Sequence, residues 1–391
     1  MELNELRKEI DTINTQILEL FIKRMTLAKG VADYKKAHNL PVFQKGREDE
    51  ILSYVKENSP DEMKECAALL FSTLFDLSRA YQTRLGAGEI LTEKDEIGES
   101  QKNSRKADIL CTKTSASFPD SARVACQGVI GAYSGIAAKK MFSSPDISYF
   151  EKFDDVFEAV KSGKCDFGVL PIENSLHGIV NRVYDLLEEY RFFIVRAFHL
   201  EIDHALLAPK GSRLCDITDV YSHEMAIGQC SRFLRENPQI KAHICENTAR
   251  AAEFVRNENN PHFAAISSPD CAEIYSLSET ARDIADSSHN FTRFICISKD
   301  LKIYGNANKV SLILSTLHRP GALYSLLSRF AAGGINIKNL ESRPKRGTDF
   351  EYRFYFDLDA SLENAADAAV IFDALDSAND AVFLGNYEEK R

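Results

Sequence analysis

The first forty residues carry a heptad pattern of aliphatic residues that is interrupted once, by an arginine. Apolar residues alternate three and four positions apart, which predicts one helix from about Glu5 to His38 with a stripe facing a partner. A cation in a buried stripe is costly unless an anion meets it, so this helix is a candidate for binding a small anion. The stripe consists of Leu3, Leu6, Ile10, Ile13, Ile17, Leu20, Arg24, Leu27 and Val31.

Two further helices are expected within residues 1–88. One begins near Lys45, and another follows Ser59, which we interpret as its N-cap with Pro60 at the first helical position. The first helix, about 50 Å long, is too long for a monomeric bundle of this size. We therefore expect an intertwined dimer. The last of the three helices is expected to bury Leu70, Leu74 and Leu77.

The composition limits the class of protein. With 391 residues and a net charge of −10, the chain has room for several domains and is not suited to bulk nucleic-acid or acidic-membrane binding. No apolar run approaches the length of a membrane span, and the N-terminus lacks a signal-peptide pattern. The nine cysteines show neither C-x-x-C nor zinc-ligand spacing, which predicts free thiols in a cytoplasmic protein.

The pattern of elements changes three times along the chain. Residues 1–88 are expected to be all-helical, and the polar residues 89–120 to form a linker. Residues 121–302 alternate short strands with amphipathic helices, which predicts an α/β domain with mostly parallel strands. Residues 308–388 follow a βαββαβ order typical of a ferredoxin-like module. The fold class is therefore multidomain, α plus α/β plus α+β.

The spacing of the cations in the first helix limits how they can cooperate. Arg7 and Arg24 lie about 25 Å apart on one helix, so a single chain cannot bring both to one small molecule. Arg24 and Lys35 lie three turns apart on roughly one face, and their long side chains could converge. Arg7 could join them only from a partner chain packed antiparallel.

Further polar residues complete a set in the helical region. The set comprises L-R-K-E-I-D at Leu6–Asp11, K-R at Lys23–Arg24, Lys35, R-E at Arg47–Glu48 and S-x-x-x-Q at Ser78–Gln82. In order and spacing it resembles the all-helical chorismate mutases. A helical dimerisation bundle with solvated cations is the alternative for this region.

This resemblance implies a role for each residue in rearranging chorismate to prephenate, a pericyclic step that needs a folded substrate and stabilised charge on the ether oxygen. Arg24, Arg47 and Arg7 of the partner subunit would hold carboxylates, assisted by Ser78. Lys35 and Gln82 would donate to the ether oxygen, and Glu48 would accept from the ring hydroxyl. Gln44, where the family often has Asp, would hydrogen-bond a hydroxyl without charge.

The α/β region carries several polar motifs at the expected ends of strands, where such sheets usually bind ligands. The glycines Gly128, Gly131 and Gly135 do not have the dinucleotide spacing. The motifs are G-x-x-G-x-Y-S at Gly128–Ser134, P-I-E-N-S at Pro171–Ser175, S-H at Ser222–His223, Q-C at Gln229–Cys230, N-T-A-R at Asn247–Arg250 and T-R-F at Thr292–Phe294. In content and order they resemble prephenate dehydratase.

The dehydratase resemblance implies a two-lobed, periplasmic-binding-protein-like domain that removes water and CO₂ from prephenate to give phenylpyruvate. Thr292 would donate to the departing hydroxyl, and Arg293 would anchor a carboxylate. His223 is interpreted as a hydrogen-bonded structural histidine, with acid–base catalysis as the alternative. The chain departs from the family at Val129, Gly135, Glu224 and Met225, which bears on substrate positioning. The residues expected to position substrate are Ser134, Asn174, Ser175, Ser222 and Gln229.

The C-terminal module resembles the amino-acid-binding ACT domains of the dehydratases through its G-A-L and E-S-R-P motifs. The resemblance implies that phenylalanine binds between two such modules and inhibits the enzyme. The residues expected at that site are Gly321, Ala322, Leu323, Asn336, Glu341 and Ser342. A plain dimerisation module is the alternative.

Together the modules resemble a bifunctional chorismate mutase–prephenate dehydratase, an isomerase and lyase of phenylalanine biosynthesis. This implies a homodimer or higher oligomer and no metal or organic cofactor. The alternative is a non-catalytic phenylalanine-sensing dimer with degenerate enzyme modules.

Overall fold

The computed structural model describes residues 2–38, 45–90, 109, 117–287, 289–316, 321–344, 352–378 and 380–391. It divides into two compact units. Unit 1 consists of Met1–Cys111 and Lys309–Phe383, and unit 2 consists of Thr112–Asn308 and Leu384–Arg391. Among the described residues, no helix is long and apolar enough to cross a membrane.

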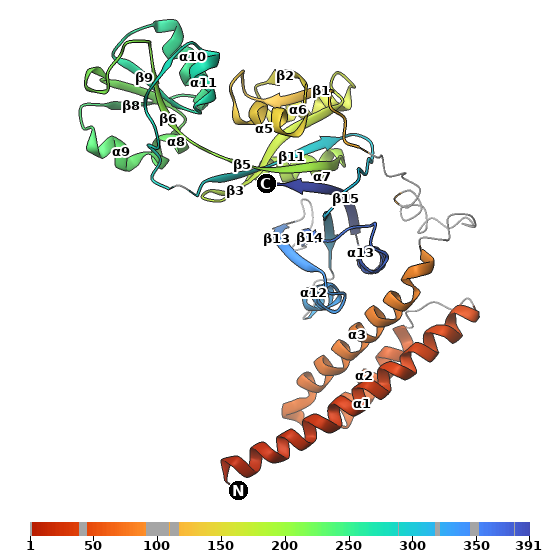
Figure 1. Ribbon diagram of the computed structural model, residues 1–391. Coiled ribbons are helices and arrows are strands. Elements are labelled where there is room, and N and C mark those ends of the chain that lie inside the picture. Colours follow the sequence, from red (N-terminus) through yellow and green to blue (C-terminus); the bar gives the residue numbers. More distant parts are fainter. Residues whose placement is uncertain are drawn as a thin grey trace. The chain divides into compact units, whose positions relative to one another are not determined.

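Three helices form the N-terminal part of unit 1 (Figure 1). They are α1 (Leu3–Ala37), α2 (Lys45–Glu57) and α3 (Lys64–Ile90), and α3 packs against both of the others. The long first helix and the start of the second near Lys45 are confirmed. The aliphatic stripe of α1 is exposed in this single chain, for example at Leu3 (62%) and Leu27 (65%).

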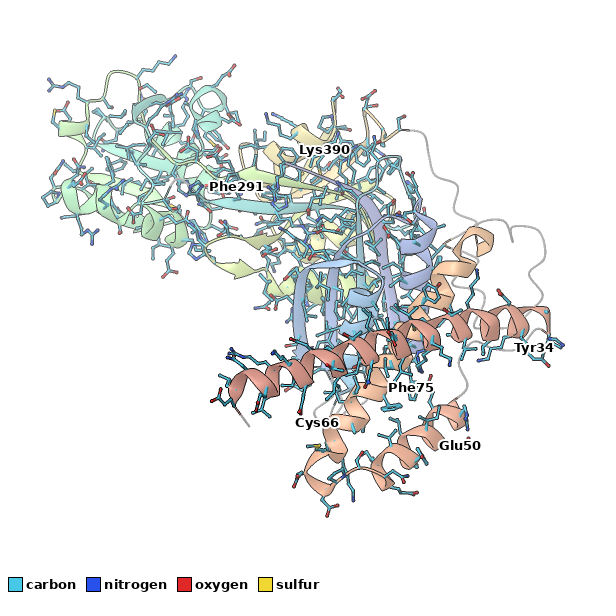
Figure 2. The ribbon with its side chains drawn as sticks, turned by 60° about the horizontal axis from the view of Figure 1, so that its bottom comes forward. Tyr34, Glu50, Cys66, Phe75, Phe291 and Lys390 are labelled. Atoms are coloured by element: carbon cyan, nitrogen blue, oxygen red, sulfur yellow. The ribbon has the colours of Figure 1, made fainter. Side chains whose placement is uncertain are left out.

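Two local predictions for α3 are wrong. Ser59 is not its N-cap, because the Ser59 hydroxyl donates to the carbonyl of Val55 in the preceding helix at 2.7 Å, and a short 3₁₀ turn precedes α3. Leu70 is not buried but 58% exposed. The buried face of α3 instead carries Phe75 and Ala80, and Figure 2 labels Phe75 on this helix.

The C-terminal part of unit 1 has the element order βαββαβ. Its sheet runs in the order β13-β14-β12-β15, and the β12–β14 and β13–β14 pairs are antiparallel. The rings of Phe330 in α12 and Phe356 in β14 pack at a tilt of 53°, with their centroids 5.3 Å apart. Helices α12 and α13 of this module also contact α3 of the same unit. The elements are β12 (Lys309–Ser315), α12 (Ala322–Ala332), β13 (Asn336–Pro344), β14 (Tyr352–Asp359), α13 (Ala365–Ser377) and β15 (Asp380–Lys390).

Unit 2 contains two lobes, each built on a sheet. The sheet of the first lobe runs in the order β5-β11-β3-β1-β2 and is flanked by the end of β15. Its strands are β1 (Arg123–Gln127), β2 (Asp146–Phe150), β3 (Phe167–Asn174), β5 (Phe193–Glu201) and β11 (Phe291–Ser298), with the short β4 (Gly178–Ile179) beside β3. Its helices are α5 (Tyr133–Met141), α6 (Phe153–Lys161) and α7 (Asn181–Tyr190).

The second lobe has a sheet in the order β10-β6-β9-β7-β8. The chain passes between the lobes twice, after β5 and before β11. The strands are β6 (Ala205–Ala208), β7 (Asp219–Ser222), β8 (Lys241–Ile244), β9 (Phe263–Ser267) and β10 (Ser278–Ala281). The helices are α8 (Glu224–Gln229), α9 (Ser231–Glu236), α10 (Thr248–Glu258) and α11 (Asp270–Ile274), and Leu214–Asp216 forms a 3₁₀ turn.

The sheets are mixed rather than mostly parallel as expected. Strands β1, β2 and β3 run parallel, but β11 is antiparallel to both of its neighbours, β3 and β5. In addition, β3 continues through Pro171 to Asn174, so this motif lies inside the strand instead of after it. The sheet tolerates Pro171 because the pairing of β3 with β11 shifts register there.

Candidate active sites

Six of the residues predicted for the helical site line one cavity of about 290 Å³ in unit 1. All three helices contribute to it, and the lining also includes Phe75 and Arg79. Four lining cations face a single lining carboxylate, which favours an anionic ligand. The six predicted residues are Arg24 and Lys35 from α1, Arg47 and Glu48 from α2, and Ser78 and Gln82 from α3.

Arg24 has the environment that its place in the heptad stripe suggested. Its Nη1 donates to the carbonyl of Leu74 at 3.1 Å, and its guanidinium lies 5.6 Å from the ring centroid of Phe75. Burial lowers the pKa of Arg24, and the charge of Glu48 acts in the opposite direction. Within the described part of the chain, Arg24 has no ion pair. A ligand carboxylate would therefore meet a cation whose charge is incompletely compensated.

Arg79 is a cavity residue that the sequence analysis missed. Its guanidinium bridges two carboxylates, Glu48 of α2 and Asp76 of α3. Burial alone would lower the pKa of Arg79, but the hydrogen bonds and charges of Glu48 and Asp76 raise it above its ordinary value. The spacing of Asp76 and Arg79, three residues apart on one helix, was the signal that could have drawn attention to this pair.

Gln82 and Arg47 also line the cavity, and their side chains make weaker contacts than Arg24 and Arg79. The Nε2 of Gln82 donates to Ser78 Oγ at 3.3 Å, while its buried Oε1 has no hydrogen-bond partner among the described residues. Arg47 pairs with Glu50 at 2.9 Å, but both side chains are more than two-thirds exposed, so this pair holds Arg47 weakly. Arg7 lies near the start of α1, exposed and outside the cavity, and Gln44 lies outside the described residues.

In unit 2, Thr292 lies in a network of side-chain amides. The Nδ2 of Asn174 donates to Thr292 Oγ1 and to Asn290 Oδ1, both at 2.9 Å. The Nδ2 of Asn290 in turn donates to Gln229 Oε1 at 3.0 Å. Thr292 and Asn174 face each other across the β11–β3 pairing, which explains why residues 118 positions apart meet. The structure therefore brings three predicted residues together, namely Thr292, Asn174 and Gln229.

Two histidines that were not predicted extend this network. The Nε2 of His204 contacts Gln229 Oε1 at 2.7 Å and must donate, because an amide oxygen can only accept. The Nε2 of His177 lies 2.7 Å from Gln229 Nε2 and therefore accepts. His204 is buried, and this burial lowers its pKa against the opposing effect of the Gln229 hydrogen bond. Such pairings join segments distant in sequence, so spacing alone did not indicate them.

Arg293 and Ser222, which were also predicted for the dehydratase site, bind groups other than the Thr292 network. Arg293 does not join the Thr292 cluster, because successive strand residues point to opposite faces. Its Nε pairs with Glu389 at 2.6 Å, and its Nη2 donates to the Tyr387 hydroxyl at 2.8 Å. Fully buried Ser222 donates to the carbonyl of Ile266 at 2.6 Å.

Three more residues from the dehydratase motifs either hydrogen-bond to the protein backbone or are buried in a helix. Ser175 Oγ accepts from the backbone N–H of Phe291 at 3.0 Å, and Ser134 is buried in the first turn of α5. His223 caps α8, with its Nδ1 accepting from Met225 N at 3.2 Å, as the structural interpretation expected.

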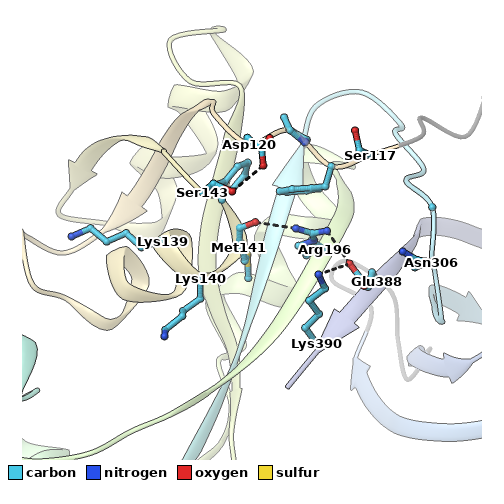
Figure 3. A pocket seen from close by; sticks show the side chains of 14 residues that line it. Ser117, Asp120, Lys139, Lys140, Met141, Ser143, Arg196, Asn306, Glu388 and Lys390 are labelled. Carbon is cyan, nitrogen blue, oxygen red and sulfur yellow. Dashed lines mark hydrogen bonds and ion pairs between the residues drawn. The ribbon is translucent and has the colours of Figure 1, made fainter.

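A second cavity of about 450 Å³ in unit 2 contains none of the predicted residues. Figure 3 shows Arg196 in this cavity, where it donates to the Met141 carbonyl at 2.9 Å and pairs with Glu388 at 2.8 Å. Its guanidinium also stacks 3.7 Å from the Phe118 ring centroid. These contacts hold the segment around Phe118 and the end of β15 against β5, which is a structural role.

The residues predicted to bind phenylalanine lie on two elements of the C-terminal module. Gly321 precedes α12 with φ +80°, no atom of the described residues beyond its chain neighbours lies within 4 Å of where its side chain would begin, and Ala322 and Leu323 follow in the first turn. Asn336 begins β13 and donates to Asp359 at 2.5 Å, and Glu341 and Ser342 lie further along the same strand.

Comparisons with known proteins match two families to different parts of the chain. The family model of chorismate mutase type II matches residues 6–83, and that of prephenate dehydratase matches residues 124–302. A bifunctional chorismate mutase/prephenate dehydratase of Escherichia coli K12 is 32% identical over 366 residues, covering 92% of this chain and 89% of the relative. The relative with that name from Aquifex aeolicus is 30% identical over 390 residues, covering 99% and 98%.

A solved structure is also similar. The prephenate dehydratase of Arthrobacter aurescens in complex with L-Phe aligns with a TM-score of 0.62 at 27% identity, covering 68% of this chain and 89% of that one. Both halves of the reaction sequence are thus represented in one polypeptide of matching length. The chain belongs to the bifunctional chorismate mutase/prephenate dehydratases, which rearrange chorismate to prephenate and convert prephenate to phenylpyruvate in phenylalanine biosynthesis.

Proposed function

We propose that the helical cavity is the chorismate mutase site and that the Thr292 network is the prephenate dehydratase site. The observation that carries the first assignment is that six residues selected from sequence line a single cation-rich cavity. The observation that carries the second is that Thr292 Oγ1 accepts a hydrogen bond from a side chain of the P-I-E-N-S motif.

In the mutase site, the arginines bind the substrate carboxylates and Lys35 stabilises the charge that develops during the reaction. Arg24, Arg47 and Arg7 of the partner subunit hold the two carboxylates of chorismate. Lys35 and Gln82 donate to the ether oxygen, where negative charge develops in the transition state. The Nε2 of Gln82 uses one proton on Ser78 Oγ and keeps the other for the ether oxygen, and Ser78 keeps its own proton for a carboxylate.

The ring hydroxyl and the second carboxylate need further contacts. Glu48 accepts from the ring hydroxyl while Arg79 holds its other side. Ser78 assists a carboxylate. No covalent step is needed, because the reaction is a rearrangement within one molecule and the site acts by fixing its folded conformer.

An intertwined dimer completes this site. The α1 stripe exposes eight large aliphatic side chains that a soluble helix would ordinarily bury. A second α1 packed antiparallel along the stripe covers them and brings Arg7 of the partner subunit toward Arg24. The eight are Leu3, Leu6, Ile10, Ile13, Ile17, Leu20, Leu27 and Val31.

In the dehydratase site, Thr292 acts as hydrogen-bond donor to the hydroxyl that leaves prephenate. Asn174 uses both protons of its NH₂ on Thr292 and Asn290, so Thr292 Oγ1 is an acceptor in that bond and its own proton stays available. The C–O bond breaks as CO₂ departs, the oxygen leaves as hydroxide that takes a proton from solvent to become water, and the electrons of the broken C–C bond complete the aromatic ring. Aromatisation drives the step, and a modest donor suffices.

The C-terminal module is a phenylalanine sensor of the ACT type. Its βαββαβ order, the left-handed Gly321 at the start of α12 and the G-A-L and E-S-R-P motifs support this assignment. The related Arthrobacter dehydratase was crystallised with L-Phe. Phenylalanine bound between two modules inhibits the enzyme only if it binds one conformational state better than the other.

One experiment tests both sites in the full-length chain. Arg24→Ala is expected to abolish prephenate formation from chorismate and to spare phenylpyruvate formation from added prephenate. Thr292→Ala is expected to do the reverse, and the matched Thr292→Ser variant, which keeps the hydroxyl, should retain activity. A non-catalytic sensor would show no turnover to lose, and loss of both activities in either variant would contradict the assignment of separate sites.

A further inference from the structure

Helix α12 of the C-terminal module packs against α3, the helix that supplies Ser78 and Gln82 to the mutase cavity (Figure 1). The hydroxyl of Ser328 donates to Asp76 Oδ2 at 2.7 Å. A second bond joins Thr73 Oγ1 and the Tyr324 hydroxyl at 3.0 Å. Asp76 is only 2% exposed, so Ser328 meets a carboxylate that water reaches very little.

The same carboxylate holds a residue of the cavity. While Oδ2 of Asp76 accepts from Ser328, its Oδ1 accepts from Nη2 of Arg79. Nη1 of Arg79 donates to Oε1 of Glu48, which lines the cavity. A guanidinium fork between two carboxylates fixes its plane and the orientation of both partners. An unbroken series of hydrogen bonds thus runs from α12 to the cavity, through Ser328, Asp76, Arg79 and Glu48.

A buried carboxylate that loses a hydrogen bond must turn toward a new donor or remain partly unsatisfied, and both are costly. If Ser328 were absent, Asp76 would rotate and carry the Arg79 fork with it. The Glu48 carboxylate would then shift relative to the other cavity groups. Catalysis by positioning is sensitive to displacements well below 1 Å, because the reacting geometry must be held within narrow limits.

We propose that Ser328, Asp76 and Arg79 are positioning residues for the mutase reaction, and that the C-terminal module supports the mutase site through them by orienting Glu48. This inference rests on the proposed role of Glu48 toward the ring hydroxyl of chorismate. None of the three needs to touch the substrate.

The test uses the full-length enzyme and measures the mutase and dehydratase rates separately, from chorismate and from prephenate. Ser328→Ala is expected to lower mutase kcat/KM about threefold to tenfold and leave the dehydratase rate unchanged. Ser328→Thr keeps the hydroxyl and should restore the mutase rate. Tyr324→Phe is the matched control, because it removes the Thr73–Tyr324 hydrogen bond between α12 and α3 without touching Asp76.

A double-mutant cycle separates positioning from loosened packing. Arg79→Lys keeps a cation beside Asp76 but cannot bridge two carboxylates with a fork. In that background Ser328→Ala should have no further effect on the mutase rate. Additive effects, an unchanged mutase rate in Ser328→Ala, or an equal loss in Tyr324→Phe would each overturn the proposal. An unchanged mutase rate in Glu48→Gln would instead overturn the proposed role of Glu48.

Discussion

Asn174 donates a 2.9 Å hydrogen bond from Nδ2 to Oγ1 of Thr292, across two antiparallel strands. The direction of this bond matters more than its length. A threonine hydroxyl has one proton, and here the oxygen receives a proton from the amide instead of giving one. The Thr292 proton can therefore point to the substrate.

Replacing Asn174 should lower the dehydratase rate. The size of the loss should depend on whether the new side chain accepts the hydroxyl proton of Thr292. Asn174→Ala frees the hydroxyl to rotate, and we expect kcat to fall about tenfold to hundredfold. Asn174→Asp should be worse, because a carboxylate accepts the Thr292 proton and removes it from the substrate. The mutase rate of the same preparations serves as the internal control. A larger loss in Asn174→Ala than in Asn174→Asp would contradict this account.

Because Arg293 is paired with Glu389, we expect its substitution to lower the stability of the protein and not to weaken the binding of prephenate. Both side chains are more than nine-tenths buried, and removing Arg293 takes away the shortest ion pair of the buried Glu389, which keeps the longer contact with His199 at 3.4 Å. Arg293→Ala should reduce the free energy of unfolding by about 3–5 kcal/mol, measured by urea denaturation. The exposed pair of Arg123 and Asp166 provides the control, since water screens its attraction and Arg123→Ala should change the urea midpoint little.

A carboxylate anchor would behave differently from a structural ion pair. If Arg293 held prephenate, its substitution would raise KM for prephenate while the urea midpoint stayed in place. This outcome would restore the role that the dehydratase resemblance implied for Arg293.

The helical site was largely predictable from sequence because its geometry is local. On a helix, spacing determines which side chains share a face, so Arg24 with Lys35 and Ser78 with Gln82 could be placed before the helices were assembled. Arg79 was missed because its partner Glu48 lies on another helix, 31 positions away in the chain. Leu70 was placed inside by periodicity alone, although a single chain leaves it exposed.

The α/β site was less predictable because its contacts depend on how strands pair. Thr292 and Arg293 are adjacent in the T-R-F motif, but the two-residue period of a strand sends them to opposite faces. Motif membership therefore gave both a substrate role, whereas the structure pairs Arg293 with Glu389 at the other end of the sequence. His204 meets Gln229, 25 positions further along the chain, a contact that no spacing rule indicates.

His204 makes the stability of unit 2 depend on pH in a defined direction. Burial lowers its folded pKa below the value of about 6.5 expected in the unfolded chain. Above that value both states hold the ring neutral. As the pH falls through it, the unfolded chain takes up the proton first, so the free energy of unfolding decreases until the folded pKa is also passed.

The His204→Gln variant isolates this contribution, because an amide can still donate to Gln229 but does not titrate. Urea midpoints would be compared between about pH 7.5 and about pH 5.5. The wild-type midpoint should fall more than that of His204→Gln, since carboxylates common to both proteins cancel in the comparison. Equal slopes would show that His204 does not contribute.

The proposed sharing of Arg7 between subunits can be tested by mixing two inactive proteins. Arg7→Ala and Arg24→Ala each lack one cation of every mutase site, so each alone should be inactive. In a heterodimer, one site draws Arg24 from the first chain and Arg7 from the second, and is intact. Random reassembly of equal amounts makes half of the dimers mixed, each with one working site of two, so about a quarter of the wild-type rate should return. A site built within one chain would recover nothing on mixing, and the dehydratase rate should stay constant throughout.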